Sequence, residues 1–401
     1  MDSTLTWLDL TASDRDRMQR VLDLFKEQGT VDEMGLGTLR DALSNVLFPG
    51  ITSIQTRLRY ALFIPWIYQM LEDRHIPSER VSEEARRAEV RLIYPLSQSQ
   101  ELGVIGINAR GSLRRLPSSV YWSCLRRWGI FQLDLSQSAY HSRFTQLRIA
   151  ATQFGRADDP GVTWQGRPNW HPRLPKRPMD FPDRALFDLT SSEALFVQGR
   201  IEERCTGTLL AHLASRSKSQ LASYFWEEPE VLRANDRVQS NVELARRFSL
   251  HVEGMPLIYN LMLAEMHRNL LGDDKDGSVV YYTEACREWV AREAREEDAF
   301  EPGTLWALVE SQGSRVNPTQ RLFVETWTDR LAKIDLDKAG TDEYLRSLIA
   351  DRERALKGRH RARLLNTNRL LDWKGGSGVG RMDFNWFRAR ELLGELYRGL
   401  G

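Results

Sequence analysis

The sequence has 401 residues, of which 28% are charged and 41% hydrophobic, and it contains 12 tryptophans. This composition can bury a substantial core and excludes a disordered, collagen-like or low-complexity chain, while the length predicts two or three folding units. The 56 basic and 55 acidic residues nearly cancel, so the total charge alone does not point to nucleic acid.

The three cysteines (Cys124, Cys205 and Cys286) are far apart and show no CxxC spacing. They predict neither a disulfide framework nor a cysteine-based zinc site, which favours a reducing compartment. No basic segment followed by an apolar stretch opens the sequence, so no secretory signal is expected. The most apolar window, 60–71, is about half the roughly 20 residues that a membrane span needs. We therefore expect a soluble, cytoplasmic protein that binds no membrane.

Apolar side chains at helical spacing dominate the first hundred residues. Four helices are predicted there, over 14–28, 36–47, 53–71 and 83–92. Pro65 should kink or divide the third helix, and Phe48-Pro49-Gly50 forms the clearest break between helices. Residues 1–100 are therefore predicted to form an N-terminal helical bundle.

A proline cluster follows a basic region that covers 101–159. Six of the chain's fifteen prolines lie between Pro160 and Pro182, a stretch that can be neither helix nor central strand. Trp164 and Trp170 lie inside it and favour a loop packed on a surface over a free tether. We predict a Pro/Trp-rich loop over 160–185, with a domain boundary near it.

Helices return after this loop, in a helical domain over 186–340 and a basic C-terminal segment over 341–401. Thr190-Ser191-Ser192-Glu193 predicts a capping box. Further helices are predicted over 241–252, 255–267, 284–295, 318–334 (with Asn317 as N-cap) and 342–363. The helix that starts at Pro318 should carry one face made of Leu322, Phe323, Thr326, Trp327 and Leu331.

Strand signals are few, and the best short candidates are 131–133 and 279–282. The predicted fold class is therefore mainly α, with multi-helix bundle domains, few short strands and one candidate winged-helix-like element in the basic region.

Basic and acidic residues are segregated along the chain. Residues 102–179 hold twelve basic side chains against three acidic ones, a net charge of +9, and residues 352–381 hold nine against two, a net charge of +7. Between them, residues 273–301 have ten acids and four bases, a net charge of −6. Two cationic surfaces suited to phosphate are therefore expected despite the near-neutral total.

The first basic block contains a short helix signal. Ser118 is predicted to cap a helix that Gly129 ends, with Tyr121, Leu125 and Trp128 on its buried face and Arg126 and Arg127 outside. A capped helix that bears arginines and precedes a short strand is compatible with the recognition element of a winged helix-turn-helix. The alternative is a core helix whose arginines bridge to acids elsewhere in the fold.

The second basic block ends in the glycine-rich loop 375–380. This loop is neither a Walker A motif nor a dinucleotide-binding turn, yet its amides could approach a phosphate, with Lys374 and Arg381 as flanking charges. A merely mobile loop is the alternative. Asp372-Trp373-Lys374 has the D-x-K spacing of restriction-type nucleases, but no convincing partner acid on a preceding strand accompanies it.

Catalytic motifs are otherwise missing from the sequence. No phospholipase-D, zinc-protease, esterase or kinase signature is present, and the seven histidines are scattered. His141 and His171 lie in the basic region, where phosphate contact, capping and core hydrogen bonding all stay open. We assign no catalytic residue and no metal ligand, expect no cofactor, and regard an enzyme as the less favoured class.

Several motifs resemble one bacterial family of unknown function, over nearly the whole chain. The matching stretches are Leu47-Phe48-Pro49-Gly50, Thr56 to Tyr60, Trp66-Ile67-Tyr68, Leu116 to Trp122, Trp170-His171-Pro172 and Leu257 to Met262. The resemblance implies a soluble protein of about this length, encoded in phage-defence islands near a helicase and a phospholipase-D-like nuclease. It brings no established functional residues to this sequence.

Together these features lead to one functional prediction. We expect a non-catalytic subunit of a bacterial antiphage assembly that binds the phosphate backbone of DNA or RNA and works with protein partners encoded nearby. Two alternatives remain, a scaffold that docks on acidic partner proteins and a divergent magnesium-dependent nuclease. The candidate nucleic-acid contacts are Arg110, Arg114, Arg115, Arg126, Arg127, Arg359, Arg361, Arg363, Lys374 and Arg381.

Overall fold

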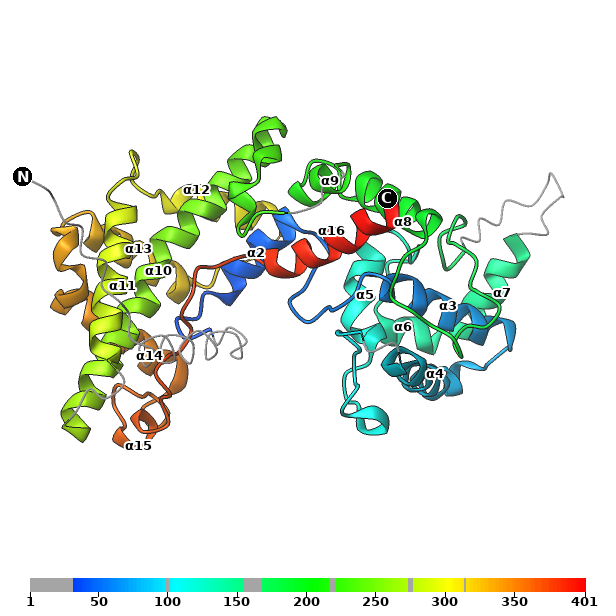
Figure 1. Ribbon diagram of the computed structural model, residues 1–401, viewed down its shortest axis with the longest axis horizontal. Helices are drawn as coiled ribbons and strands as arrows, with labels where there is room; N and C mark the ends of the chain where they lie inside the picture. Colours follow the sequence, from blue (N-terminus) through cyan, green and yellow to red (C-terminus); the bar gives the residue numbers. More distant parts are fainter. Residues whose placement is uncertain (1–31, 99–100, 155–167, 217–220, 273–276, 314) are drawn as a thin grey trace, which may run out of the picture. The chain divides into compact units, whose positions relative to one another are not determined.

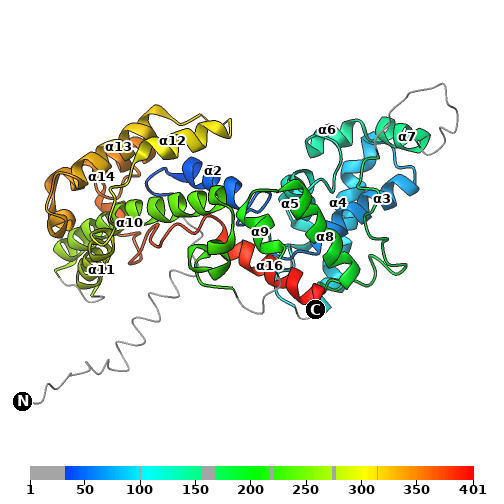
Figure 2. The ribbon, with the colours of Figure 1, turned by 90° about the horizontal axis from the view of Figure 1, so that it is seen from above.

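The structure is a computed structural model that describes residues 32–98, 101–154, 168–216, 221–272, 277–313 and 315–401 (Figures 1 and 2). The chain forms two compact units, and each unit combines segments that are distant in the sequence. Unit 1 comprises the chain up to Leu43 together with Glu243–Met382, and unit 2 comprises Ser44–Val242 together with Asp383–Gly401. The sequence predicted five consecutive segments and did not indicate that each unit combines distant parts of the chain.

Unit 2 is built around the apolar helix α3 (Tyr60–Asp73), of which nearly every side chain is buried. Helices α4 (Ser78–Gln98) and α5 (Pro117–Arg127) pack against it, and the short α6 (Gln137–Ser142) and α7 (Phe144–Phe154) pack on α4. Helix α8 (Ser191–Arg204), α9 (Leu209–Ala214) and the C-terminal α16 (Trp386–Leu400) form a second group of helices, in which α16 lies along α8 and α9 (Figures 1 and 2). The unit is therefore closed by a segment that follows unit 1 in the sequence.

The longest helix of unit 1 is α10 (Asp236–Leu271). The chain passes from one unit to the other within α10 and also within α2 (Gly37–Leu47). The remaining elements of unit 1 are α11 (Ser278–Glu293), α12 (Pro302–Ser311), α13 (Pro318–Leu331), η4 (Leu336–Thr341), α14 (Glu343–Lys357) and α15 (Thr367–Leu370). A Cβ atom at Gly254 of α10 would lie only 2.4 Å from the Trp289 ring of α11. Glycine at this position therefore lets the two helices approach closely, and the indole nitrogen of Trp289 donates to the backbone oxygen of Leu250 (2.9 Å).

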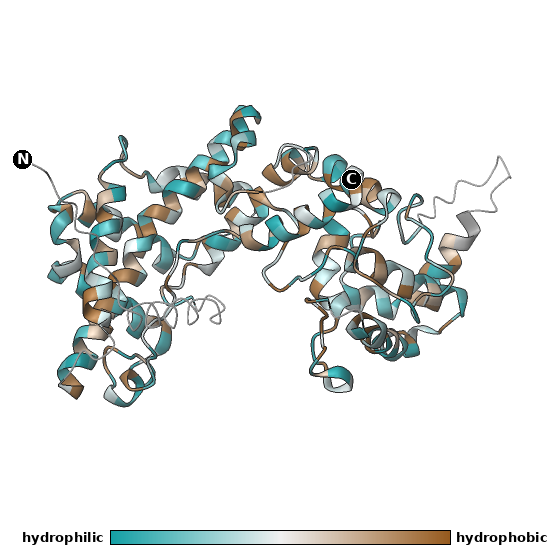
Figure 3. Ribbon diagram, in the orientation of Figure 1, coloured by the Kyte–Doolittle hydropathy of each residue, from teal (hydrophilic) through white to brown (hydrophobic). Residues whose placement is uncertain are grey.

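Most helices carry separate apolar and polar stretches, which Figure 3 shows as brown and teal on the same ribbon. The mainly α prediction is confirmed, and none of the described helices is long and apolar enough to cross a bilayer. Two local predictions are confirmed in detail. Thr190 and Glu193 form the reciprocal capping box of α8, and the Asn317 side chain accepts from the amide of Thr319 at the start of α13.

Several predicted elements are wrong. The segment 279–282 lies inside α11, and 131–133 contributes only an isolated bridge between Phe131 and Trp170, so the described residues contain no strand. The predicted third helix begins at Tyr60 instead of Ser53, and the helices over 241–252 and 255–267 are one helix, α10. Helix α14 ends at Lys357, and Leu322 is 65% exposed, so it does not belong to the buried face of α13. The predicted helix 14–28 and residues 160–167 of the proline-rich loop lie outside the described residues, while Trp170 in the described part of the loop is buried.

Candidate nucleic-acid interface

Hydrogen bonds and a buried leucine hold the loop between α4 and α5 in place on unit 2. The guanidinium group of Arg86 on α4 donates to the backbone oxygens of Leu113 and Gly111 (2.7 Å each). The amide of Ile105 donates to the hydroxyl of Tyr60 (3.0 Å), and Leu113 is itself buried. These bonds fix the path of an irregular segment that would otherwise have no regular backbone partner.

Arg110, Arg114 and Arg115 lie on this fixed loop and are exposed. None of the three guanidinium groups forms an ion pair with a carboxylate in the part of the chain that the structure describes. Arg110 opens the short 3-10 helix Arg110–Ser112 with a φ of +43°. The loop therefore presents three uncompensated positive charges from a backbone that the rest of unit 2 holds in place.

Helix α5 is anchored at its N-terminal end by a buried carboxylate. Glu89 of α4 accepts from both the amide and the hydroxyl of Ser118 (2.7 Å each). Ser118 is therefore not the predicted N-cap, because the helix begins at Pro117 and its N-cap residue is Leu116. A carboxylate near the first turn of a helix complements the positive end of the helix dipole.

Glu89 is 1% exposed and no ion pair joins it to a basic side chain of the described residues. Burial raises the pKa of its carboxyl to about 7, and the two bonds from Ser118 only partly oppose that rise. Gln137 of α6 continues the network, since its side-chain amide donates to the hydroxyls of Ser118 (2.8 Å) and Tyr68 (3.0 Å). The Tyr68 hydroxyl lies 2.7 Å from Nε2 of His141, so this histidine contributes to the internal packing of unit 2.

The opposite end of α5 combines the predicted buried face with exposed arginines. Tyr121, Leu125 and Trp128 are 0–1% exposed, as the sequence predicted, while Arg126 and Arg127 are exposed. Arg126 is paired with Asp134, whereas Arg127 has no carboxylate partner among the described residues. The predicted α5 helix thus exists, but no described strand follows it that could form the wing of a winged helix-turn-helix.

In the second predicted surface, which lies in unit 1, two of the five predicted contacts pair with acidic side chains of the same unit. Arg363 donates to the carboxylate of Glu33 (2.9 Å) and to the hydroxyl of Ser377 (2.8 Å), and Arg381 lies 3.4 Å from the carboxylate of Glu253. Both are only partly exposed. Arg363 and Arg381, which were predicted as nucleic-acid contacts, are therefore already paired with acids that are distant in the sequence.

Arg359, Arg361 and Lys374 are exposed. Arg361 donates to the backbone oxygen of Lys357 (3.0 Å), while Arg359 and Lys374 form no ion pair within the described residues. Of the contacts predicted in this block, these three are exposed and form no ion pair with a described carboxylate.

The glycine-rich loop 375–380 is tied to unit 1 by buried side chains. Asn260 donates to the backbone oxygen of Ser377 and Tyr282 donates to that of Gly375 (2.7 Å each). Glu33 accepts from Ser377, Lys357 and Arg363, and although burial alone would raise the pKa of its carboxyl, these bonds hold it below the ordinary value. The loop is therefore a packed element of unit 1 and not an open phosphate cradle.

Asp372 belongs to no group of metal-binding side chains among the described residues. It is exposed, follows the single-turn helix α15 and pairs with Arg369 (3.1 Å). Within the described ranges, no group of three or more histidine, cysteine, aspartate or glutamate side chains is placed to hold a metal ion.

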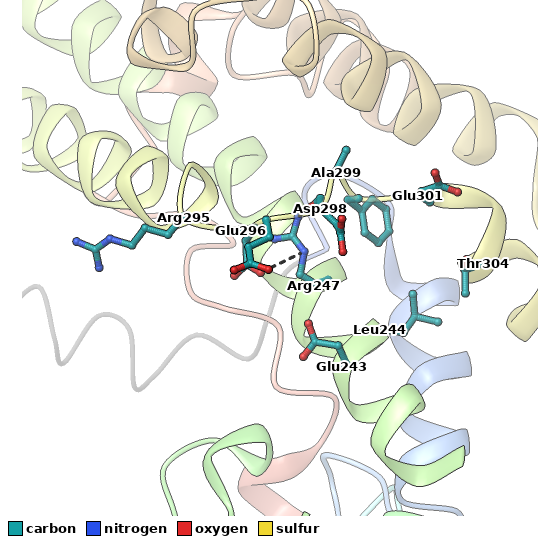
Figure 4. A pocket seen from close by; sticks show the side chains of 11 residues that line it. Glu243, Leu244, Arg247, Arg295, Glu296, Asp298, Ala299, Glu301 and Thr304 are labelled. Atoms are coloured by element: carbon teal, nitrogen blue, oxygen red, sulfur yellow. Dashed lines mark hydrogen bonds and ion pairs between the residues drawn. The ribbon is translucent and has the colours of Figure 1, made fainter. Parts of the chain in front are cut away.

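A separate cavity of about 470 Å³ lies in unit 1, between α10 and the segment that joins α11 to α12 (Figure 4). Its lining includes five acidic side chains against two arginines. One of these arginines, Arg247, lies close to the carboxylates of Glu293 (3.3 Å) and Glu296 (3.5 Å). None of the predicted site residues lines this cavity, and its negative charge does not suit a phosphate.

Sequence reasoning missed the residues that position the interface. Arg86 belongs to no sequence motif. From the sequence, Glu89 looks like an ordinary exposed acid of an amphipathic helix, and only the structure shows that it bonds to Ser118, 29 residues later. The one signal that could have marked Glu89 is its spacing from Val81, Ala85, Leu92 and Leu96, which share the buried side of α4.

Comparison with known proteins adds a family but no activity. One family model, described as a family of unknown function (DUF6361), matches residues 2–399. No curated protein and no solved structure matches the sequence significantly.

Proposed function

Because the chain belongs to DUF6361, a family of unknown function, we propose its role from surface chemistry: a non-catalytic subunit that binds the phosphate backbone of nucleic acid. The observation that carries the proposal is the α4–α5 loop of unit 2. There a pinned backbone presents Arg110, Arg114 and Arg115 without carboxylate partners among the described residues. Guanidinium groups of this kind form bidentate bonds with phosphate oxygens.

Arg127 extends this surface along α5, and Arg126 joins it when a phosphate displaces Asp134 from the exposed pair. In unit 1, Arg359, Arg361 and Lys374 provide weaker support as a second group of contacts. We leave Arg363 and Arg381 out of the proposed interface. The geometry around Asp372 gives no basis for a nuclease role.

Contacts of this type position a nucleic acid without reading its bases. We therefore propose binding with little sequence preference and, on the resemblance noted above, a place in a bacterial antiphage assembly with a helicase and a phospholipase-D-like nuclease as partners. The protein would hold the nucleic acid on which those partners act.

A fluorescence-anisotropy titration with a labelled 20-base-pair duplex tests this proposal. Four phosphate contacts predict a slope of log K against log salt of about −3.6, and micromolar affinity at moderate salt. The variant Arg114→Glu/Arg115→Glu should bind at least about tenfold more weakly, because it removes two contacts and adds two repulsive charges. Arg237→Glu, an exposed arginine of unit 2 outside the loop, is the matched control.

Affinity that does not respond to salt, or that is equal in the loop variant and the control, would sink the proposal. The alternative is a scaffold that docks these arginines on an acidic partner protein. In that case the purified chain ignores nucleic acid but co-purifies with a neighbouring gene product after nuclease treatment, and the loop variant loses that partner.

A further inference from the structure

The C-terminal ends of α5 and α8 meet in unit 2 and bring together cations from three separate segments. Arg200 of α8 donates to the backbone oxygen of Trp128 (3.2 Å), to Nε2 of His171 (2.8 Å) and to the carboxylate of Glu203 (2.8 Å). Arg200 is only 3% exposed, so these bonds fix the end of α5, the end of α8 and the loop around His171 against one another.

Arg204 lies directly on the end of α5 because Gly129 has no side chain. A Cβ atom at Gly129 would lie 3.1–3.2 Å from the Nε, Cδ and Cγ atoms of Arg204. Beneath them, burial raises the pKa of the Cys205 thiol to about 11, while the positive charges of Arg127 and Arg204 oppose that rise. Arg127 stands only two residues before Gly129, so the close approach of Gly129 to Arg204 brings the ends of α5 and α8, and these two arginines with them, to one region of unit 2.

A third cation, Arg173, belongs to the same region, because its backbone amide donates to Nδ1 of His171 (3.2 Å) and Nε2 of the same ring accepts from Arg200 (2.8 Å). Burial lowers the pKa of His171, and the charges of Arg200 and Arg173 lower it further. Arg127, Arg173 and Arg204 are all exposed, and none forms an ion pair with a carboxylate in the part of the chain that the structure describes. The exposed carboxylate of Glu203 lies in the same region, but it is bonded to Arg200 (2.8 Å) and forms no ion pair with these three cations, which therefore stay available to a polyanion.

We propose that Arg173 and Arg204 join Arg127, which ends the surface proposed above, in a second phosphate-binding site for the same nucleic acid, here called the α5–α8 cluster. This inference rests on the proposed function. The α4–α5 loop lies at one end of α5 and the α5–α8 cluster at the other, and an 11-residue helix is about 16 Å long. At about 3.4 Å per step along one strand of a duplex, the two sites are about five nucleotides apart.

The exposed face of α5 between the two sites leaves room for a nucleic acid to approach the helix closely. Ser119 and Ser123 are exposed there, one helical turn apart, and their side chains are short and polar. Hydroxyl groups of this kind commonly donate to phosphate and sugar oxygens. A nucleic acid that lies along α5 would thus touch both cation sites with little obstruction between them.

The test uses the full chain and measures anisotropy with a labelled 20-base-pair DNA duplex between 50 and 200 mM salt. Arg173→Gln/Arg204→Gln should weaken binding about tenfold and reduce the magnitude of the salt slope by about 1.8, which corresponds to two lost contacts. Arg237→Gln/Arg287→Gln removes two exposed arginines outside both sites and should change neither quantity. Arg204→Lys keeps the charge and should keep the slope.

Arg114→Gln/Arg115→Gln separates the inference from the proposed function. If this loop variant binds weakly while Arg173→Gln/Arg204→Gln binds like the wild type, the α5–α8 cluster is refuted and the proposed function stands. If none of the variants differs from the wild type, both are refuted. Repeating the series with single-stranded DNA and duplex RNA shows which nucleic acid the two sites bind most tightly, and loss of affinity in the cluster variant with that probe supports the second site.

Discussion

The buried carboxyl of Glu89 predicts that the stability of unit 2 depends on pH in a way that one substitution removes. Its pKa is about 7 in the folded chain and about 4.5 when exposed. Between these values the unfolded chain has released the proton that the folded chain still holds, so the free energy of unfolding falls as pH rises from about 4.5 to 7. At 1.36 kcal/mol for each unit of pKa, the loss amounts to about 3 kcal/mol.

Glu89→Gln should abolish this dependence, because glutamine keeps the shape and cannot ionise. Urea unfolding followed by tryptophan fluorescence at several pH values between 4.5 and 8 gives the free energy of unfolding of each protein. The wild type should lose about 3 kcal/mol relative to Glu89→Gln across this range, and subtracting the two curves cancels every other titrating group. If the glutamine bonds less well to Ser118, the free energy of unfolding of Glu89→Gln is lowered equally at every pH, which does not change its dependence on pH.

The control is Glu202→Gln, which makes the same chemical change at an exposed position of α8. Its pH profile should run parallel to that of the wild type. If the Glu89→Gln profile also ran parallel, Glu89 would ionise as an ordinary carboxyl, and the reasoning from its burial would be refuted.

Two further substitutions probe unit 1. Gly254→Ala should lower the free energy of unfolding by about 1–3 kcal/mol, because its Cβ would overlap the Trp289 ring. Urea unfolding measures this loss against the control Gly303→Ala, where a Cβ meets open space, and equal stability of the two variants would contradict the close approach. Glu33→Gln should lower the free energy of unfolding by about 1.5–3 kcal/mol, because it removes the carboxylate that pairs with Arg363 and one of the two that pair with Lys357. Limited proteolysis should then cut the 375–380 loop faster than in the exposed control Glu310→Gln, and unchanged cleavage would mean that Glu33 does not hold the loop.

Local chemistry was the most predictable part of the fold. The capping box at Thr190 and the N-cap at Asn317 were predictable because each involves residues two or three positions apart. Ser118 looked equally like a cap, but its partner Glu89 lies on another helix and competes for the same hydroxyl. The two helices predicted over 241–252 and 255–267 are one helix, α10, in which Gly254 packs against the Trp289 ring of α11.

The candidate interface was predictable in its composition but not in its pairing. Counting charges along the chain located both basic blocks, and the five arginines predicted as contacts in the first block are exposed. The count could not show that Glu33, more than 300 residues earlier, neutralises Arg363, because such pairs depend on tertiary contacts. For the same reason it missed Arg204, which only the fold places beside α5.

The position of α16 constrains the order in which the chain can fold during synthesis. Trp386 stacks on Phe48 at 5.6 Å, and the Tyr397 hydroxyl donates to the backbone oxygen of Leu213 (2.7 Å), so α16 completes the core of unit 2. Ribosomes add about 5–20 residues each second, and the whole 243–382 segment of unit 1 is made before α16. Unit 2 therefore remains without α16 for on the order of ten seconds, during which the apolar side chains that α16 covers, such as Phe48, are exposed to solvent.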